Sequence, residues 1–361
     1  AVHDALAAPS VEGVTARIEF TNKLIDGSSL SPGSPLLKGA SGRLWASSKT
    51  HSLRLELQSD RGDAQLVVNG KSAWLYDASA NTVYRGQLPQ HSATKQAKRP
   101  ETGKHEIPTL KEISDAIAHI DRNANLSGAI PSSIAGQKAY TVRISPKHDG
   151  GLLGAGELAW DAAHGLPLRL AVYAQGSSSP VLELKATDIN FGPVDSGVFN
   201  TAPPKGAKVV ELNQSKADEA HSKADRARHG ARSKTEVRGP QAVQAALPFR
   251  LAAPAKLAGI PRHDVRLLGW GGSPAALVTY GENLGGIAVI EQKLKPGEKA
   301  SLGNGNRRSE DQLPKVSVNG ATGTELATAL GTVVRFERGG IAYTVLGSIP
   351  AQAAEAAARG L

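Results

Sequence analysis

Apolar and polar residues alternate one by one over much of the region from Val11 to about Asp188, and this period limits the fold more than any other feature. Successive side chains of a strand point to opposite faces, so a period of two predicts strands with one buried face. Such strands belong to antiparallel sheets, because strands of parallel sheets read as continuous apolar runs. The alternation is clearest in residues 17–20, 53–57, 140–144, 168–172 and 182–185.

Turn signals separate these segments at the spacing of a sheet that curls or closes. Asn69-Gly70 predicts a tight hairpin between 65–68 and 72–76, and Asp161–Gly165 separates two further strands. We count about ten or eleven strands before residue 189, at the 8–12-residue spacing typical of curled sheets.

One amphipathic helix is predicted within this strand-rich region. Leu110, Ile113, Ile117 and Ile120 recur at helical spacing in Thr109–Asp121. Thr109 with Glu112 forms a capping-box pattern, which favours a helix start at this point. Because strands flank the helix on both sides, its apolar face is expected to cover part of the apolar face of the sheet.

The chain divides into three predicted segments: a half-barrel domain at 1–208, a charged flexible linker at 209–246 and a small α+β domain at 247–361. The linker carries charges of both signs and no aromatic residues between 211 and 240. This alternation of sign favours a solvated tether over a nucleic-acid-binding arm.

The C-terminal segment mixes short alternating runs with two helical patterns. We predict helices at Thr322–Leu330 and Pro350–Arg359, and a turn at Gly339-Gly340. Strands are predicted at 265–268, 276–280, 286–291, 315–318, 332–337 and 341–346.

The composition excludes several classes of site. Cysteine is absent, which removes disulfides, thiolate metal sites and cysteine nucleophiles. No familiar catalytic or phosphate-loop motif occurs, the ten His residues are scattered, and we expect no metal, no cofactor and no enzymatic activity. A hydrolase whose site leaves no sequence motif is a minor alternative. The net charge of +9 is compatible with nucleic acid, an anionic membrane surface or solubility alone.

Three segments then carry a family resemblance: 69–77 (NGKSAWLYD), 135–146 (AGQKAYTVRISP) and 160–169 (WDAAHGLPLR). In this order they resemble the LolA-like lipoprotein-carrier superfamily, which includes the N-terminal domain of the RseB/MucB regulators. Residues 323–332 and 339–348 look like the second domain of membrane-tethered relatives in Gram-positive bacteria.

The resemblance implies a mainly β (α+β) fold, in which an unclosed antiparallel β-barrel wraps around helices and encloses a hydrophobic cavity for acyl chains. It also implies an extracytoplasmic, non-catalytic protein that is secreted or tethered to the membrane by an N-terminal segment absent from this sequence. Carriers of the superfamily transfer lipidated proteins, whereas its regulators bind an anti-sigma factor. The second domain distinguishes this chain from the carriers.

We therefore expect acyl lipid or lipoprotein binding in a hydrophobic groove. The alternative is a regulatory module that binds a membrane-associated partner, such as an anti-sigma factor, through its C-terminal domain; nucleic acid is not an expected partner. An ordinary packed core explains the same apolar pattern equally well. Leu30, Leu36 and Leu37 are the candidate flap. The candidate groove residues on the sheet and helix are Ile18, Phe20, Trp45, Leu53, Leu55, Leu57, Leu66, Val68, Trp74, Leu110, Ile113 and Ile117.

Overall fold

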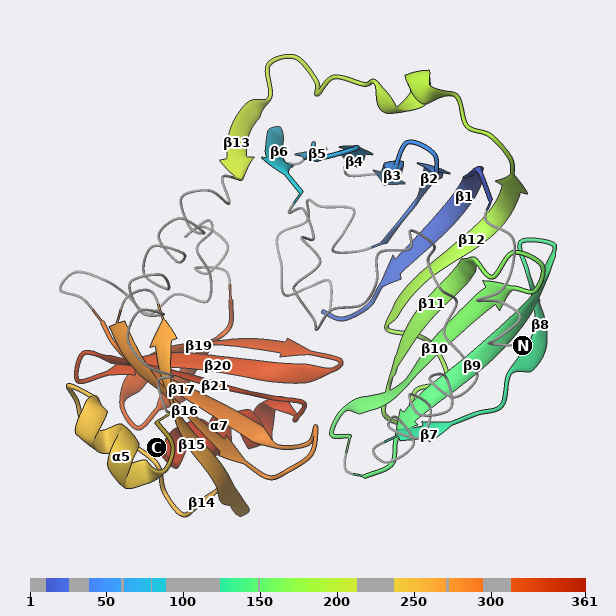
Figure 1. Cartoon of the computed structure of the whole chain (residues 1–361). Helices are drawn as coiled ribbons and strands as arrows, with labels where there is room; N and C mark the ends of the chain where they lie inside the picture. The colour runs from blue at the N-terminus through green and yellow to red at the C-terminus, as the bar shows by residue number, and fades with distance from the viewer. Residues whose placement is uncertain are drawn as a thin grey trace, which may run out of the picture.

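The chain forms two units, each built on its own β-sheet (Figure 1). The computed structural model describes residues 11–25, 39–59, 62–78, 80–88, 124–148, 150–212, 237–270, 273–294 and 313–361.

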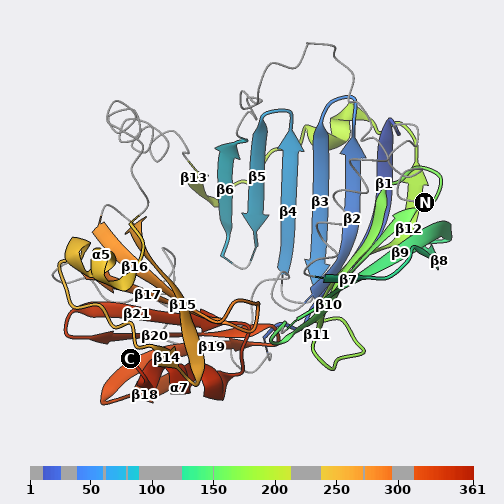
Figure 2. The same ribbon diagram turned by 60° about the horizontal axis from the view of Figure 1, so that its bottom comes forward.

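The first unit is a curled sheet of thirteen strands, in which β8 pairs only with β9 (Figure 2). Every neighbouring pair is antiparallel except β13 and β6, which are parallel. From one edge to the other the strands are β13 (Lys208–Leu212), β6 (Thr82–Gln87), β5 (Ser72–Asp77), β4 (Gly62–Asn69), β3 (Ser52–Ser59), β2 (Gly39–Ser47), β1 (Gly13–Asn22), β12 (Leu182–Phe191), β11 (Pro167–Ala174), β10 (Leu153–Asp161), β9 (Gln137–Pro146) and β7 (Ala124–Leu126), with β8 (Ile130–Ile134) off this path.

The predicted antiparallel, mainly β architecture of this region is confirmed. The alternating segments are strands, and the hairpin at Asn69-Gly70 forms with Asn69 paired to Ser72. Gly70 has a φ of +59°, a backbone conformation that glycine adopts without a steric penalty.

The chain after β12 identifies the outer face of the curled sheet. Its short 3₁₀ helix η1 (Ser196–Phe199) lies on the convex side of β3 and β4 (Figure 1). Arg54 Nη1 donates a hydrogen bond of 2.9 Å to the carbonyl oxygen of Val198, and Phe199 is buried. Side chains that share a face with Arg54 are therefore on the outside, and those of the opposite parity line the concave side.

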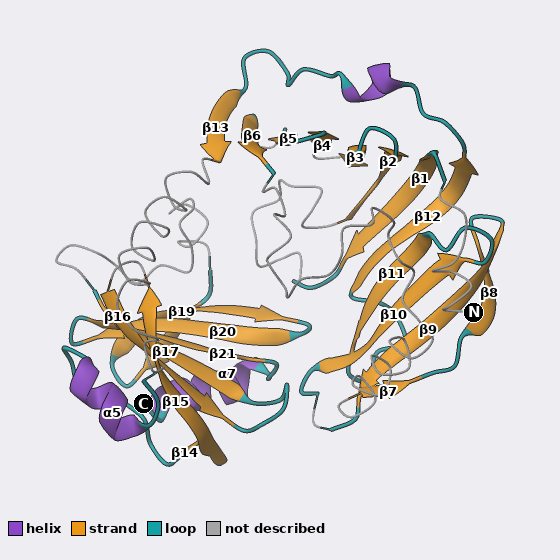
Figure 3. Cartoon of the chain, viewed as in Figure 1, coloured by secondary structure: helices purple, strands orange, loops and turns teal. Residues whose placement is uncertain are grey.

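The second unit is an eight-stranded antiparallel sheet with helices on one face (Figure 3). Helices α5 (Pro240–Ala246) and α7 (Ala351–Arg359) contribute Val243, Ala354, Ala357 and Ala358 to its core. The strands, in sheet order, are β14 (Lys256–Leu257), β15 (Ile260–Trp270), β16 (Ser273–Tyr280), β17 (Ile287–Lys293), β21 (Ile341–Gly347), β20 (Gly331–Arg338), β19 (Ala321–Thr328) and β18 (Lys315–Val318).

The six strands predicted in this unit form, as do the turn at Gly339-Gly340 and the C-terminal helix. The helix predicted at Thr322–Leu330 is wrong, because these residues belong mainly to strand β19. That segment pairs with β18 on one side and β20 on the other, and its buried residues Gly323 and Glu325 alternate with more exposed ones. Its threonines suit a strand, and pairing on both edges prevails over a weak helical pattern.

Both ends of the predicted linker carry secondary structure. Strand β13 pairs with β6 of the first sheet, and helix α5 packs against the core of the second unit. Residues 213–236 lie outside the described residues, as does the helix predicted at Thr109–Asp121. In the described part of the chain, no helix has both the length and the apolar character needed to cross a membrane.

A small polar junction joins the two units. The amide of Leu152 donates to the backbone oxygen of Ser348 (2.9 Å) and to its Oγ (3.0 Å). A second contact links Ala329 N to the carbonyl oxygen of Leu24 at 2.7 Å. Gly151 has a φ of +60°, and a Cβ there would lie 2.0 Å from the backbone oxygen of Ser348. This close approach therefore requires glycine.

Candidate functional site

The strand register places alternate apolar residues of the first sheet on its concave face. Leu158, Leu170, Leu184, Phe20 and Ala40 occupy directly paired positions across β10, β11, β12, β1 and β2. Since paired residues point to the same face, these five side chains form one continuous apolar row.

A second row continues the same face toward the other edge. Leu44, Leu55, Leu66 and Leu75 occupy paired positions across β2, β3, β4 and β5. Tyr84 on β6 pairs with Leu75 and extends the row by one strand. The concave face is thus apolar from β10 to β6.

Part of this face is open to solvent. Leu170 is 50% exposed and its neighbour Leu184 is 36% exposed. Ile144 lies on the next strand, β9, two residues along from the row that contains Leu158, and is 37% exposed. Exposed leucines are common singly, but a paired set on one sheet face indicates a surface for binding.

A hollow of about 200 Å³ adjoins the exposed leucines. Its lining is mostly apolar and comes from the neighbouring strands β2, β1, β12 and β11. The lining residues are Val14, Ala16, Ile18, Leu44, Ala46, Leu166, Pro167, Leu168, Arg169, Leu170, Leu184, Lys185, Ala186 and Ile189.

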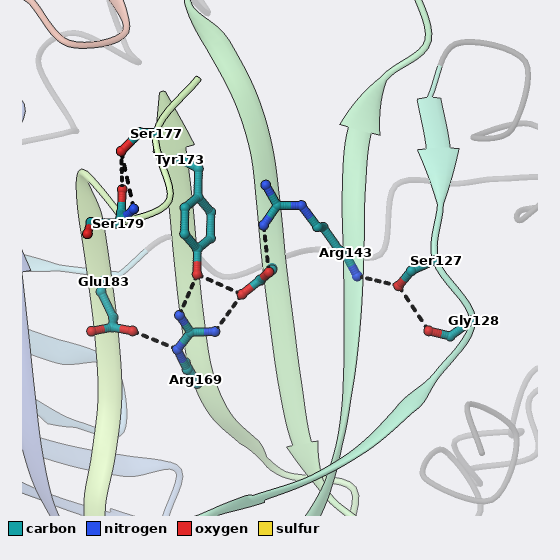
Figure 4. Close-up of polar contacts among 9 residues, drawn as sticks. Ser127, Gly128, Arg143, Arg169, Tyr173, Ser177, Ser179 and Glu183 are labelled. Carbon is teal, nitrogen blue, oxygen red and sulfur yellow. Dashed lines mark hydrogen bonds and ion pairs between the residues drawn. The ribbon is translucent and has the colours of Figure 1, made fainter. Parts of the chain in front are cut away.

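The convex face of the same strands carries a continuous network of ion pairs (Figure 4). The carboxylate of Glu157 accepts hydrogen bonds from Arg143 and Arg169, each at 2.7 Å, and one from Tyr173 at 2.8 Å. Arg169 also donates to Glu183 at 2.6 Å. Burial alone would raise the pKa of Glu157, but these donors outweigh it and lower the pKa below its ordinary value.

The two faces of the sheet differ in chemical character. In the network around Glu157 on the convex face the charged groups satisfy one another, so this part of the face offers few free donors or acceptors. On the concave face the leucines have no polar requirement and gain free energy from any apolar surface that covers them. The arrangement suits an elongated apolar ligand.

Seven of the predicted sheet residues do lie on the concave face. Within this set Ile18 and Leu57 are 6% and 4% exposed and belong to a small core cluster, so they support the face from within. Phe20 and Leu55 are partly buried against that cluster. The seven are Ile18, Phe20, Leu53, Leu55, Leu57, Leu66 and Val68.

The placement of Trp45 and Trp74 in the groove is wrong, since both tryptophans lie on the convex face. Trp45 pairs with Arg54, whose guanidinium lies 5.4 Å from the centre of the indole ring. Trp74 pairs with Val67 and is buried with it in a separate cluster. The error is one of parity, because a shift by one residue moves a side chain to the other face.

The remaining predicted groove and flap residues lie outside the described residues: Leu110, Ile113, Ile117, Leu30, Leu36 and Leu37. The exposed leucines Leu170 and Leu184 are not among the predicted groove residues. Their signal was available in the alternation of 168–172 and 182–185, and strand pairing would place both residues beside Phe20.

A polar pair lies in the turn between β10 and β11. Asp161 Oδ1 lies 2.6 Å from His164 Nδ1 and accepts a hydrogen bond from the His164 amide at 2.7 Å. The pair stabilises the turn between β10 and β11, and the His164 ring packs on Phe191 at 4.1 Å. Among the described residues, no group of three or more His, Cys, Asp or Glu side chains could hold a metal ion.

No known family profile matches this sequence, and no curated protein matches it. Several solved structures are similar to it. A crystal structure of MucB in complex with MucA(peri) has 13% identity and a TM-score of 0.42, covering 99% of this chain and 93% of that one. The MucA/MucB complex of Pseudomonas aeruginosa has 14% identity, coverage of 99% and 94%, and the same TM-score of 0.42.

A LolA superfamily protein from Nitrosomonas europaea is similar over a shorter stretch. It has 11% identity and a TM-score of 0.18, covering 55% of this chain and 96% of that one.

Proposed function

We propose that this chain is a non-enzymatic binding protein whose concave sheet face receives the acyl chains of lipids or lipoproteins. The observation that carries the proposal is the paired, solvent-exposed leucines Leu170 and Leu184 beside an apolar hollow. Together with Phe20 on β1 they form a continuous apolar row. The binding surface is therefore an elongated track rather than a single pocket. An acyl chain is long, apolar and flexible, and fits such a track.

The energetics favour this ligand class. Each methylene moved from water to an apolar surface contributes about 0.8 kcal/mol, so about ten methylenes supply several kcal/mol without any polar contact. Binding of this kind tolerates different headgroups, because the apolar face makes no directional hydrogen bonds. The proposed ligand class therefore includes both lipids and lipidated proteins.

The same chemistry motivates the proposed location and role. Acyl lipids are encountered at membranes, so we place the protein outside the cytoplasm, at or near the membrane surface. The proposal includes no catalytic step.

The first test is mass spectrometry of an organic extract from full-length protein purified without detergent. A stoichiometric acyl lipid is the expected result, because an apolar track retains a ligand acquired during expression. Protein that is empty should take up a dansyl-labelled fatty acid. Failure of both measurements would overturn the proposal and favour the alternative function, a regulatory module that binds a protein partner.

The second test assigns the ligand to the concave face. Replacing Leu170→Asp and Leu184→Asp together should weaken uptake of the dansyl probe at least tenfold, because both new carboxylates would have to be desolvated by the acyl chain. Leu284→Asp is the matched control, since Leu284 is 58% exposed and lies in the second unit. Unchanged uptake by the folded double variant would contradict the assignment.

A further inference from the structure

Two arginines face each other on the convex side of the first sheet. Arg17 on β1 and Arg43 on β2 are directly paired in the strand register, and both are exposed. Like charges in directly opposite positions destabilise an antiparallel pair. This pairing therefore calls for a compensating interaction.

Carboxylates of the same face do not provide it. Glu56 is paired with Arg43 in register, but its carboxylate forms an ion pair with Arg54 and accepts a hydrogen bond of 2.9 Å from Gln65. Asp188 stands opposite Arg17 on β12. Among the described residues, no ion pair joins Arg17 or Arg43 to an acidic side chain. Other arginines of this face, such as Arg169, are bound by carboxylates on both sides.

A hollow of about 600 Å³ lies beside the two arginines. Ser41, Thr187, Gln58 and Glu56 line it together with Arg17 and Arg43. The carboxylate of Glu56 is engaged by Arg54. Thr187 is the extra residue of a β-bulge in β12, where Arg17 pairs with Asp188 and Ile18 with Ala186. Bulges redirect side chains and often occur next to binding sites.

We propose that Arg17 and Arg43 bind a phosphate group in this hollow, either inorganic phosphate or the phosphate of a lipid headgroup. A carboxylate offers two acceptor oxygens, fewer than a phosphate group offers. A phosphate has enough acceptor oxygens to bridge two guanidiniums and still accept from a hydroxyl. The bound anion would also turn the repulsion between the arginines into a favourable arrangement. This site lies on the opposite face from the proposed acyl track and does not depend on it.

The test is isothermal titration of the full chain with inorganic phosphate at constant ionic strength. The double variant Arg17→Gln/Arg43→Gln should bind phosphate at least tenfold more weakly than the unmodified chain. The control Arg250→Gln/Lys256→Gln removes the same charge from exposed positions of the second unit and should bind normally. Equal loss of phosphate binding in both double variants would show that net charge alone causes the effect, and would overturn the proposal. Normal binding by Arg17→Gln/Arg43→Gln would also overturn it.

Two further variants keep the result independent of folding defects. Asp188→Asn removes the carboxylate that stands opposite Arg17 in register and should tighten phosphate binding. Arg43→Gln should raise the melting temperature in phosphate-free buffer, because it relieves the like-charge pair. Absence of both effects would count against the pairing as the basis of the site.

Vesicles then distinguish the two sources of phosphate. Phosphatidylglycerol vesicles should retain the unmodified chain and release it on addition of inorganic phosphate, if the headgroup is the ligand. Binding to inorganic phosphate alone, with no vesicle retention beyond that of the double variant, would identify free phosphate. No binding in either arm would overturn the proposal.

Discussion

The two sheets of this protein share one sequence pattern and differ in what covers it. In the second unit Val278, Val289 and Val345 are fully buried, and the helices α5 and α7 pack on the sheet. In the first unit the equivalent apolar face leaves Leu170 50% exposed and Leu184 36% exposed. An alternating strand therefore reveals which face is apolar, but not whether that face is a core or a binding surface.

The helices explain how the second face is closed. Ala354, Ala357 and Ala358 are buried on one side of α7, and their small side chains allow the helix to lie close to β20 and β21. Helix α5 contributes Val243 from the other end of the unit. The described helix nearest the first sheet, η1, packs on its convex face against β3 and β4.

The largest expected effect is a loss of stability in the second unit, whose sheet face is covered. Phe336 is 1% exposed and stacks on Tyr343 with 4.9 Å between the ring centres. Phe336→Ala should destabilise the second unit by about 3–5 kcal/mol, since it removes buried area and leaves a cavity. Urea unfolding followed by circular dichroism measures this loss. A cost below about 1 kcal/mol would mean that the second face is no better packed than the first.

The second effect is a change of about 1–3 kcal/mol in the free energy of unfolding with pH. It comes from a carboxylate buried in the second unit. Glu291 is fully buried; its Oε2 accepts a hydrogen bond from the Ala252 amide at 2.9 Å, and its Oε1 has no hydrogen-bond partner. Burial raises the pKa of Glu291 to about 7, against the favourable influence of Arg338. The hydroxyl-bearing rings of Tyr280 and Tyr343 also experience its charge.

The sign of the pH effect follows from that raised pKa. Between about pH 4.5 and pH 7 the folded chain holds a proton on Glu291 that the unfolded chain has released. The free energy of unfolding should therefore fall as the pH rises through this window. Glu291→Gln should abolish that part of the pH dependence in urea unfolding at pH 5 and pH 8. An unchanged slope in the variant would show that other groups cause it.

Much of the fold follows from the local sequence pattern. Which face of the sheet a side chain lies on depends on how the strands pair. The alternation at 53–57 and 168–172 predicts strands correctly. The two-residue turn after Asn69 pairs Leu66 with Leu75 and Val67 with Trp74, so the convex position of Trp74 could have been derived from the hairpin itself. The position of Trp45 follows in the same way from the short hairpin between β2 and β3, in which Ser47 pairs with Ser52 and Trp45 with Arg54.

The segment 322–330 shows where local pattern fails to predict the type of element. Its apolar residues recur at spacing compatible with a helix, yet strands on both sides pair with it. The exposure of Leu170 and Leu184 was equally inaccessible, because coverage is a property of the tertiary structure. Local pattern therefore predicts the elements and the apolar face, and the assembled sheet decides which part of that face is open.

A substitution at the junction tests whether the two regions behave as separate units. It should weaken the contact between them by about 1–3 kcal/mol. Gly151→Ala would place a Cβ 2.0 Å from the Ser348 backbone oxygen at a φ of +60°. The contact between Leu152 and Ser348 should open while both sheets stay folded. Limited proteolysis and small-angle scattering should show a more extended chain with unchanged circular dichroism. An unchanged scattering profile would indicate that other contacts hold the units together.

The smallest expected effect concerns the open region and is the most informative about it. Leu184→Ala should cost less than about 1 kcal/mol of folding free energy, because a side chain that is 36% exposed beside the exposed Leu170 loses little buried area. The same variant should measurably weaken uptake of the dansyl-labelled fatty acid, since Leu184 lies between Leu170 and Phe20 in the apolar row.

Urea unfolding and probe titration on the same Leu184→Ala sample separate the two explanations of the concave face. A binding surface loses affinity and keeps its stability, because the leucine contacts a ligand rather than the rest of the chain. A packed core does the opposite: truncating a buried leucine costs about 2–5 kcal/mol. A cost in that range, with uptake unchanged, would mean that the first sheet is closed like the second, and the contrast between the two regions would disappear.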